Sequence, residues 1–549
     1  MSELFTSSNL VFKKKDTFAC VYNNRTGWYF PGSEGLWTFL ESFQYGREIE
    51  PQERDSDPKL DKLLTELTRH RYLLSERGRE LSEYLNFYPM RTNYTVYYHG
   101  EAGTDVAIQR KGALGEVDFE VTTIKGVGET LWNLCDGSRT VSDSIGILAK
   151  ETGENYGAVK RKVLERMKEW TSIDLQILRL LPASISSYSE IPPQLNTIAP
   201  FLPALKTSTT KFAEDVKEYH VTGIHEGYDQ FERVESTLSH IYRKPHSILG
   251  GKSYGEALLS RIIKRISLER DCRILEVGGG HGDISKDILL TLKNKKPDVY
   301  PSIAYIIYDL APRLIESQRR LHKESGTSVK HIHGDGEELA LADASIDIIL
   351  SNEVIADFQT PELTMQEVKE LPKKYGIPIN KQILESLKNT PDGFRINLGA
   401  FRLLKEVERV LKPGGFAIIT EYGFEDRLPF LAKHLDHAEY SVNFMHMTSV
   451  ANALGLDVEL TDAFRFLNFH ADVELITHPS FQAAFRILEN NGVHLPNLVY
   501  TKELFQDQLG DKADSFENVE FVKCRKEPIE IVKVLICTKP LINKDNQKS

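Results

Sequence analysis

Residues 273–282 read RILEVGGGHG, and this stretch decides the fold class of the region around it. The letters RILEV form a β-like run, the glycine loop follows at once, and a helical pattern extends from Ile284 to Lys293. A strand, a glycine loop and a helix in this order are typical of an α/β sheet that binds a ligand at the loop. Glycines let the ligand approach the backbone, and the helix N-terminus offers free N–H groups. The loop by itself predicts an adenosine-containing ligand and fits a nicotinamide enzyme as well.

Three further motifs follow at the spacing of such a sheet. A strand-like run at 303–308 ends at Asp309, whose carboxylate can bind both hydroxyls of a ribose. The motif HGDGE begins at His333, the run DASIDIILSNE ends the fourth strand, and LKPGGF at 411–416 leads into the next one. Taken alone, Asp309 also fits a helix N-cap, and the acids of HGDGE also fit a solvated loop. Because these acids follow successive strands of the same series as the glycine loop, together they indicate one binding site.

This series of motifs resembles the class I S-adenosylmethionine-dependent methyltransferases. The resemblance implies an α/β domain with a Rossmann-like, seven-stranded sheet and S-adenosylmethionine as the cofactor. It leaves little room for a dehydrogenase, because the later motifs have no role in one. In this family the residue that matches Asp335 accepts a hydrogen bond from the adenine amino group. The resemblance implies these donor-binding residues: Glu276, Gly278, Gly280, Gly282, Asp309, Leu310, Asp335, Gly336 and Asn352.

The stretch SNEVIADF at 351–358 ends the fourth strand, where this fold faces the transferable methyl group. Together with the glycine loop, YIIYDLAPRLIESQRRL and ITEYG, it is similar to the MidA-like methyltransferases over residues 242–467. That family includes mitochondrial enzymes that methylate a protein arginine. The catalytic candidates in this chain are Asn352, Glu353, Asp357 and His437.

Two of these candidates carry carboxylates, which fit a cationic acceptor. Glu353 and Asp357 can hold a guanidinium by charge-assisted hydrogen bonds, and Glu353 can also take the proton released on transfer. The alternative is that both acids only cap or pair locally. The stretch 359–397 is longer and more helical than the MidA-like pattern, and an insertion there can roof the acceptor pocket. The identity of the substrate therefore stays open.

The N-terminal part repeats one pattern. GSEGLWTFLESF at 32–43 and GVGETLWNLCDG at 126–137 both place a tryptophan in an apolar i, i+3, i+4 pattern after short β-like runs. Each is followed by a further helical pattern. We predict two small winged-helix-like α+β domains, residues 1–88 and 96–182, with a coincidence of helix starts as the alternative.

These two units resemble the PqqD-like domains that bind leader peptides of ribosomally made, modified peptides; the second copy is the closer match. Such domains present an edge strand to which an extended peptide can add by backbone hydrogen bonds. The first copy lacks the Asp-Gly turn after its tryptophan helix, which favours a packing or dimerising role and hence a homodimer.

Composition limits the remaining classes. The chain has 549 residues and a net charge of −11, which argues against a nucleic-acid partner because phosphate binding needs a basic surface. Five scattered cysteines predict neither a disulfide framework nor a metal site. No signal peptide and no apolar run of the roughly 20 residues that span a bilayer are found, so we expect a cytoplasmic protein outside the membrane. Residues 183–230 are predicted as a linker and helical connection, and 231–540 as the methyltransferase domain.

The leading hypothesis is a methyltransferase that modifies a ribosomally synthesised precursor peptide or protein, recruited by the N-terminal units. A guanidinium of arginine is the favoured acceptor. One alternative is a small-molecule O- or N-methyltransferase of a biosynthetic cluster whose front half is an oligomerisation module. The other is a scaffold that binds S-adenosylmethionine and docks a protein partner during assembly.

Overall fold

The computed structural model divides into two compact units, each of which is described by itself. Unit 1 contains residues 1–208, 477–494 and 505–520, and unit 2 contains the remainder. The structure describes residues 3–15, 18–75, 84–92, 94–111, 117–185, 202–205, 216–223, 244–266, 268, 271–388, 390, 393–433, 438–493, 501–524 and 532–541.

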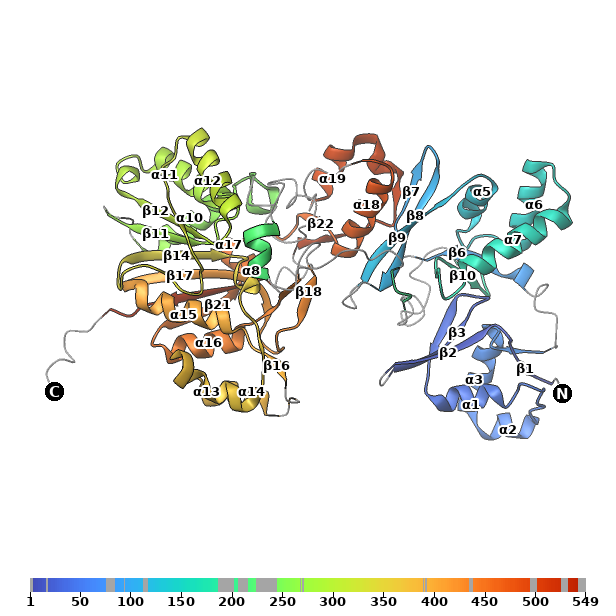
Figure 1. The fold of residues 1–549 in the computed structure, drawn as a ribbon. Coiled ribbons are helices and arrows are strands. Elements are labelled where there is room, and N and C mark those ends of the chain that lie inside the picture. Colours follow the sequence, from blue (N-terminus) through green and yellow to red (C-terminus); the bar gives the residue numbers. More distant parts are fainter. Residues whose placement is uncertain are drawn as a thin grey trace. The chain divides into compact units, whose positions relative to one another are not determined.

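Unit 2 is built on one mixed sheet in the strand order β13-β12-β11-β14-β17-β25-β21, with the short strand β20 beside the end of β17 (Figure 1). β11 to β14 and β17 run parallel, whereas β25 is antiparallel to both of its neighbours. The sheet has eight strands, so the predicted number of seven is not confirmed. The strands are β11 (Arg273–Val277), β12 (Ala304–Asp309), β13 (Lys330–His333), β14 (Ile346–Asn352), β17 (Leu411–Phe424), β20 (Val442–Asn443), β21 (Asp457–Asp462) and β25 (Val532–Thr538).

Helices cover both faces of this sheet (Figure 1). The alternation along β14 explains the two layers, because Ile348 and Leu350 are buried with the residues of α10 and α11 while Ile349 is buried with those of α15 and α16. The stretch 359–397 contains two helices between two short antiparallel strands that pair with each other, and its apolar residues join the core on the α15 side. The helices are α10 (Tyr254–Arg265), α11 (Asp283–Lys295), α12 (Pro312–Ser325), α13 (Met365–Tyr375), α14 (Lys381–Leu387), α15 (Leu398–Val410) and α16 (Phe444–Ala453).

This order of strands places a topological switch point between β11 and β14. The chain leaves β11 toward β12 on one side and continues, after β13, with β14 on the other side of β11. The carboxyl ends of β11 and β14 are therefore neighbours whose following loops turn in opposite directions. Ligands of doubly wound sheets bind at such a switch point.

The two halves of unit 1 repeat one order of elements, three antiparallel strands followed by three helices. Their assignment as winged-helix domains stays a prediction. The first half contains β2 (Leu10–Lys15), β3 (Phe18–Asn23), β4 (Trp28–Pro31), α1 (Glu34–Glu41), α2 (Pro51–Ser56) and α3 (Pro58–Arg69). The second contains β7 (Tyr97–Gly100), β8 (Gly103–Lys111), β9 (Val117–Ile124), α5 (Val127–Leu134), α6 (Val141–Thr152) and α7 (Tyr156–Trp170).

Buried contacts join the two halves of unit 1. β10 (Leu178–Leu181), which follows the second set of helices, pairs with β6 (Tyr88–Arg91). Its Leu180 carbonyl accepts a hydrogen bond of 2.8 Å from the indole N–H of Trp28 in the first half. Trp132 is fully buried in the core of the second half, as its place in the repeat predicts for an apolar helix face.

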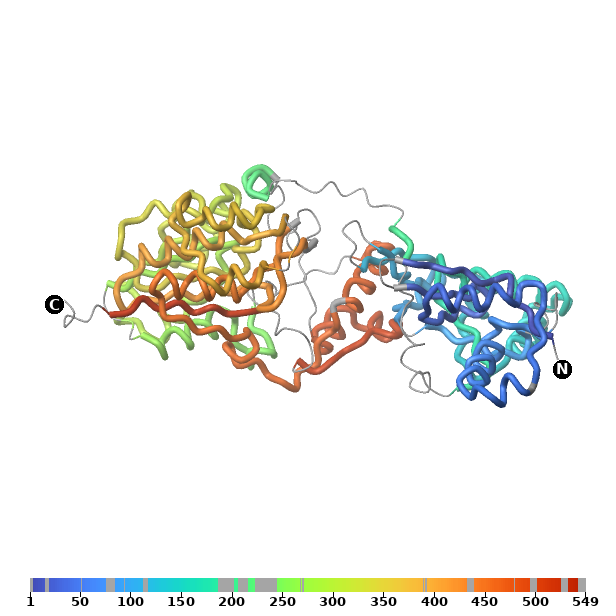
Figure 2. The backbone as a smooth tube through the Cα atoms, turned by 90° about the horizontal axis from the view of Figure 1, so that it is seen from below, coloured from blue at the N-terminus to red at the C-terminus, as the bar shows by residue number. Residues whose placement is uncertain are grey.

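The chain returns to unit 1 near its C-terminus. α18 (His478–Asn490) packs on β8 and β9, where Ala483 and Ile487 are buried against the sheet (Figures 1 and 2). β23 (Phe516–Glu517) then pairs with β7. The range 231–540 predicted for the methyltransferase domain therefore includes two stretches that pack in unit 1, and no sequence pattern indicated this return. Among the described residues, no helix has the length and apolar character needed to cross a membrane.

Candidate functional site

The glycine loop lies between β11 and α11. Gly278, Gly280 and Gly282 all have positive φ angles, of 69°, 51° and 93°. A Cβ atom on Gly278 would collide with the side chain of Val354, whereas one on Gly280 would meet nothing within 4 Å. The loop thus needs glycine at 278 for both conformation and space, and it leaves open space above Gly280.

Asp309 ends β12 and holds the glycine loop in place. Its carboxylate accepts hydrogen bonds from the backbone N–H of Gly279 (3.0 Å), the backbone N–H of Ala311 (2.9 Å) and the side-chain amide of Gln318 (2.8 Å). Burial raises the pKa of Asp309, while these three hydrogen bonds act in the opposite direction. Leu310, the next predicted donor residue, is half-buried beside it.

Glu276 lies near the end of β11, directly before the glycine loop, and its side chain is 1% exposed. The hydroxyl of Tyr305 donates a hydrogen bond to its Oε2 atom (3.1 Å), and burial raises the pKa of Glu276 to about 8. The side chain of Glu276 is therefore held by the neighbouring strand β12, through Tyr305.

The loop after β13 contains Asp335 and Gly336. Oδ1 of Asp335 accepts the backbone N–H of Glu337 (2.9 Å), and Oδ2 lies 2.6 Å from the ammonium of Lys217. A Cβ atom on Gly336 would collide with Phe358. The loop thus packs against the segment that follows β14, as two parts of one site should.

Asn352 ends β14 next to the glycine loop and is 6% exposed. The hydroxyl of Tyr254 donates a hydrogen bond to its Oδ1 atom (3.0 Å). Its buried Nδ2 atom has no hydrogen-bond partner in the described part of the chain. A buried, unpaired N–H group fits a polar ligand, since such a group is costly to leave unpaired.

More carboxylates lie near the predicted acceptor residues than were named from the sequence. Glu353 follows β14 with a positive φ of 49°, and Asp357 pairs with His220 at 3.0 Å. Glu421, near the end of β17, is 3% exposed and accepts the backbone N–H groups of Ala356 (3.2 Å) and Tyr422 (2.9 Å).

The charges around Glu421 act on one another. Burial raises the pKa of Glu421 well above its ordinary value, and the neighbouring carboxylates of Glu439 and Glu353 raise it further. Glu439 belongs to the short strand β19 (Ala438–Tyr440), which lies against the residues Ile355–Asp357. The carboxylates of Glu353, Glu421 and Glu439 are called the acid cluster below.

One predicted site residue lies outside the described part of the chain, and three residues near the site were not predicted. His437, predicted as a catalytic candidate, lies outside the described residues. Glu421 was not singled out, although it belongs to the ITEYG motif that supported the MidA-like resemblance. Lys217 and His220 were also missed, because they lie in the range predicted as a linker.

Residues 268–459 match a family model described as a methyltransferase domain. Among solved structures, the chain is similar to the cyclase SpnF, with 15% identity, a TM-score of 0.31 and coverage of 60% of this chain and 98% of that one. It is also similar to phosphoethanolamine N-methyltransferase 2 of Haemonchus contortus (13%, TM-score 0.33, 60% and 61%) and to the CMeT domain of the citrinin polyketide synthase (15%, TM-score 0.26, 52% and 51%). Comparison with curated proteins gives no match.

The fold and the site together define the class. The region contains a methyltransferase domain of the class I fold, as predicted, and its cofactor is S-adenosylmethionine; its sheet is mixed. The open space at Gly280 and the unpaired Nδ2 of Asn352 fit this ligand. The narrower MidA-like and PqqD-like resemblances stay predictions.

Proposed function

We propose that the protein methylates a cationic side chain, most simply the guanidinium of an arginine, in a ribosomally synthesised peptide or protein that unit 1 recruits. The acid cluster carries this proposal. It lies at the carboxyl ends of β14 and β17, next to the segment whose Val354 touches the glycine loop. Glu353 and Glu439 both act to raise the pKa of the buried Glu421, and such a gathering of negative charge favours a cationic group among the three carboxylates.

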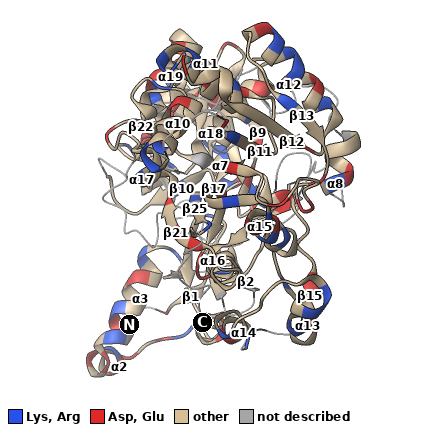
Figure 3. Cartoon of the chain, turned by 90° about the vertical axis from the view of Figure 1, so that its left-hand side faces the viewer, with Lys and Arg blue, Asp and Glu red and all other residues tan. Residues whose placement is uncertain are grey.

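Aromatic rings beside the acid cluster suit the same acceptor. Tyr422, Phe424 and Phe430 form a connected group with ring centroids 5.5 to 6.2 Å apart. The guanidinium of Arg427 lies 4.6 Å from the centroid of Phe424, so a planar cation can stack on this ring. Acidic and basic positions are interspersed along the outer helices α12 and α13 (Figure 3), whereas carboxylates gather at the acceptor side.

The residues of the chain supply positioning and proton transfer. When bound, S-adenosylmethionine supplies the methyl group from its sulfonium centre. Carboxylates can orient the guanidinium through charge-assisted hydrogen bonds, so that one nitrogen is aligned with the methyl carbon. As the nitrogen–carbon bond forms and the carbon–sulfur bond breaks, the nitrogen must lose a proton, and Glu353 is the group proposed to take it.

Unit 1 supports recruitment of an extended peptide. β23 of the same chain pairs with the β7 edge of the second sheet, whereas β9 at the other edge pairs only with β8 among the described strands. A peptide strand can add to such an edge. The β9 edge also lies directly before α5, whose first turn borders a groove.

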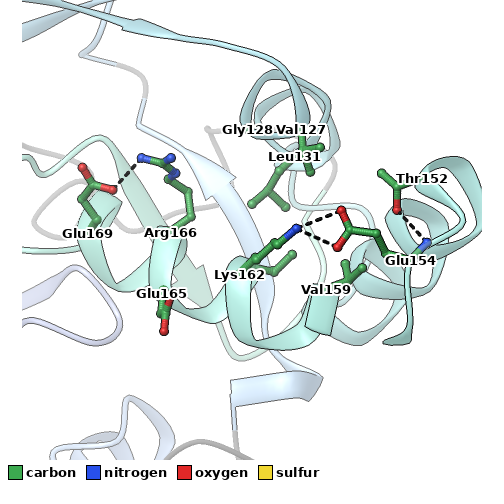
Figure 4. Close-up of a pocket in the computed structure, with 11 residues that line it drawn as sticks. Val127, Gly128, Leu131, Thr152, Glu154, Val159, Lys162, Glu165, Arg166 and Glu169 are labelled. Atoms are coloured by element: carbon green, nitrogen blue, oxygen red, sulfur yellow. Dashed lines mark hydrogen bonds and ion pairs between the residues drawn. The ribbon is translucent and has the colours of Figure 1, made fainter. Parts of the chain in front are cut away.

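This groove has a volume of about 350 Å³ and lies between α5 and α7 (Figure 4). Its floor is apolar, and Val127 at its rim is 41% exposed. Two ion pairs flank it, Lys162 with Glu154 and Arg166 with Glu169. An apolar groove with charged borders is suited to a peptide that carries both apolar and charged side chains. The residues that line it are Val127, Gly128, Leu131, Thr152, Glu154, Val159, Lys162, Val163, Glu165, Arg166 and Glu169.

The proposal is tested with isotope-labelled S-adenosylmethionine and the product of a short reading frame that adjoins the gene. Mass spectrometry should find the label on an arginine of that peptide. Glu353→Gln and Glu421→Gln should abolish transfer while S-adenosylhomocysteine still binds, and Glu385→Gln, an exposed acid on α14, serves as the control. Label on a metabolite from the same extract instead would favour the small-molecule alternative, and binding without any transfer would favour a scaffold.

Recruitment is tested separately from chemistry. Val127→Asp places a charge in the apolar groove and should raise the KM for the whole precursor without changing kcat for a short arginine peptide. Tyr156→Asp, at a similarly exposed position outside the groove, is the matched control. Equal KM values for both variants would contradict recruitment by this groove.

A further inference from the structure

A short helical segment from the predicted linker contacts the methyl-transfer site at three points. It consists of α8 (Val216–Glu218) and the helical turn Tyr219–Gly223, and α8 lies beside the sheet of unit 2 (Figure 1). We call it the bridging segment. Its Lys217 reaches the loop after β13, its Tyr219 the start of α12, and its His220 the segment after β14.

Lys217 joins two carboxylates on the donor side. Its ammonium lies 2.6 Å from Oδ2 of Asp335 and 2.7 Å from Oε1 of Glu337. The side chain of Glu337 is 2% exposed and is also held by Arg402 at 3.1 Å. Burial acts to lower the pKa of Lys217, but the two carboxylates outweigh it and raise that pKa. Lys217 therefore stays protonated and fixes the carboxylate expected to receive the adenine amino group.

Tyr219 and His220 attach the same segment to the ribose and acceptor sides. Tyr219 is 7% exposed and packs on Ala311 and Leu314, directly after Asp309. Nε2 of His220 lies 3.0 Å from Oδ2 of Asp357, and both side chains are 18% exposed. The imidazole is close enough to Asp309 to influence its protonation. One segment of eight residues thus contacts the donor loop, the residues after β12 and the acceptor loop.

We propose that Lys217 and His220 are positioning residues of the methyl-transfer site: Lys217 orients Asp335 for the donor, and His220 connects the bridging segment to Asp357 on the acceptor side. The two contacts belong to one short helical segment, so each stabilises the geometry of the other. Donor binding and the order of the acceptor loop are therefore coupled through residues 216–223. Nothing in this coupling depends on which acceptor the enzyme uses.

The Lys217 arm is measured by calorimetric titration of the full chain with S-adenosylhomocysteine. Lys217→Met should raise the Kd about tenfold or more, the range for a lost hydrogen bond to a charged group. Lys217→Arg should restore most of the affinity, because it keeps the cation. Lys412→Met removes a similar ion pair with Asp347 at the opposite end of β14 and should leave the Kd unchanged. An unchanged Kd for Lys217→Met overturns the proposal. A lower Kd overturns it as well, because it would mean that Lys217 competes with the donor.

The His220 arm is measured by hydrogen exchange of the bridging segment and of residues 352–358. In the unmutated protein, S-adenosylhomocysteine should slow exchange in both. In His220→Asn the donor should still slow exchange at 216–223 but lose most of its effect on 352–358. His99→Asn, which removes a histidine–carboxylate pair in unit 1, is the control. Equal protection of 352–358 in His220→Asn and the unmutated protein overturns the coupling, and a failure of S-adenosylhomocysteine to bind the unmutated protein overturns the whole proposal.

Discussion

The hydroxyl of Tyr254 donates a hydrogen bond to Oδ1 of Asn352 across 3.0 Å, and this bond connects α10 to the carboxyl end of β14. Both residues are buried. This hydrogen bond fixes the orientation of the Asn352 amide: Oδ1 accepts from Tyr254, and Nδ2 is left to donate to a ligand. Tyr254 of α10 thus sets the direction in which Nδ2 of Asn352 points at the proposed donor site.

Replacing this tyrosine tests that role. Tyr254→Phe leaves Oδ1 of Asn352 buried without its donor, which should lower the free energy of unfolding by about 1–3 kcal/mol. The Kd for S-adenosylhomocysteine should rise several-fold, because the amide is free to rotate. Chemical denaturation measures the first effect and calorimetric titration the second. The control is Tyr300→Phe, the same substitution in the short helix before β12. A loss of stability with an unchanged Kd would contradict the orienting role.

Gln318 is expected to act on the donor through Asp309. Its amide donates to Asp309 and to the carbonyl of Gly280 (2.9 Å), so it connects Asp309, the proposed ribose ligand, to the glycine loop. Gln318→Leu should raise the Kd for S-adenosylhomocysteine about tenfold, the effect of losing a hydrogen bond to a charged group. Gln318→Glu should raise it more, because it places a second carboxylate against Asp309. Gln366→Leu on α13 is the control; equal affinities for Gln318→Leu and the control would sink this assignment.

Glu276 should make stability depend on pH in a defined direction. Its pKa is about 8 in the folded protein and near 4.5 when unfolded, so unfolding releases a proton between these values. The stabilising effect is present at pH 4.5 and is lost as pH rises to 8, by at most ~1.4 kcal/mol per pH unit. Glu276→Gln cannot ionise, so relative to the unmutated protein it should gain stability from pH 5 to 8. Urea denaturation over this range checks it, and parallel curves would contradict it.

The C-terminal return should stabilise unit 1. Ile487 of α18 is fully buried against the sheet of β7 to β9, so Ile487→Ala should cost about 2–5 kcal/mol in that unit. Hydrogen exchange should rise in β8 and β9 and stay unchanged in β11 and β14. Ile383→Ala, also fully buried but on α14, should show the reverse distribution. A uniform rise in both units for either variant would refute this local effect.

The positions of the proposed donor residues were predictable, because these residues follow strands and are marked by local patterns. The run RILEV, the glycines after it and Asp309 after the next strand all lie where periodicity and turn chemistry indicate element ends. Parallel strands bring their carboxyl ends to one edge of a sheet, so these ends could be expected to meet. The burial of Glu276 was not predictable in the same way, because it depends on Tyr305 from a neighbouring strand.

The sequence by itself determined the class I methyltransferase fold, the methyl donor and the loops at the strand ends that are proposed to bind it, because each is encoded in a short run of neighbouring residues. Tertiary structure alone decided that Lys217 and His220 reach the site, that Glu421 joins Glu353 in the acid cluster, and that α18 and β23 complete unit 1. These contacts join residues far apart in the chain, and no local periodicity records such pairings. Their energies come from burial and from opposite charges brought together only when the sheet and its helices have formed.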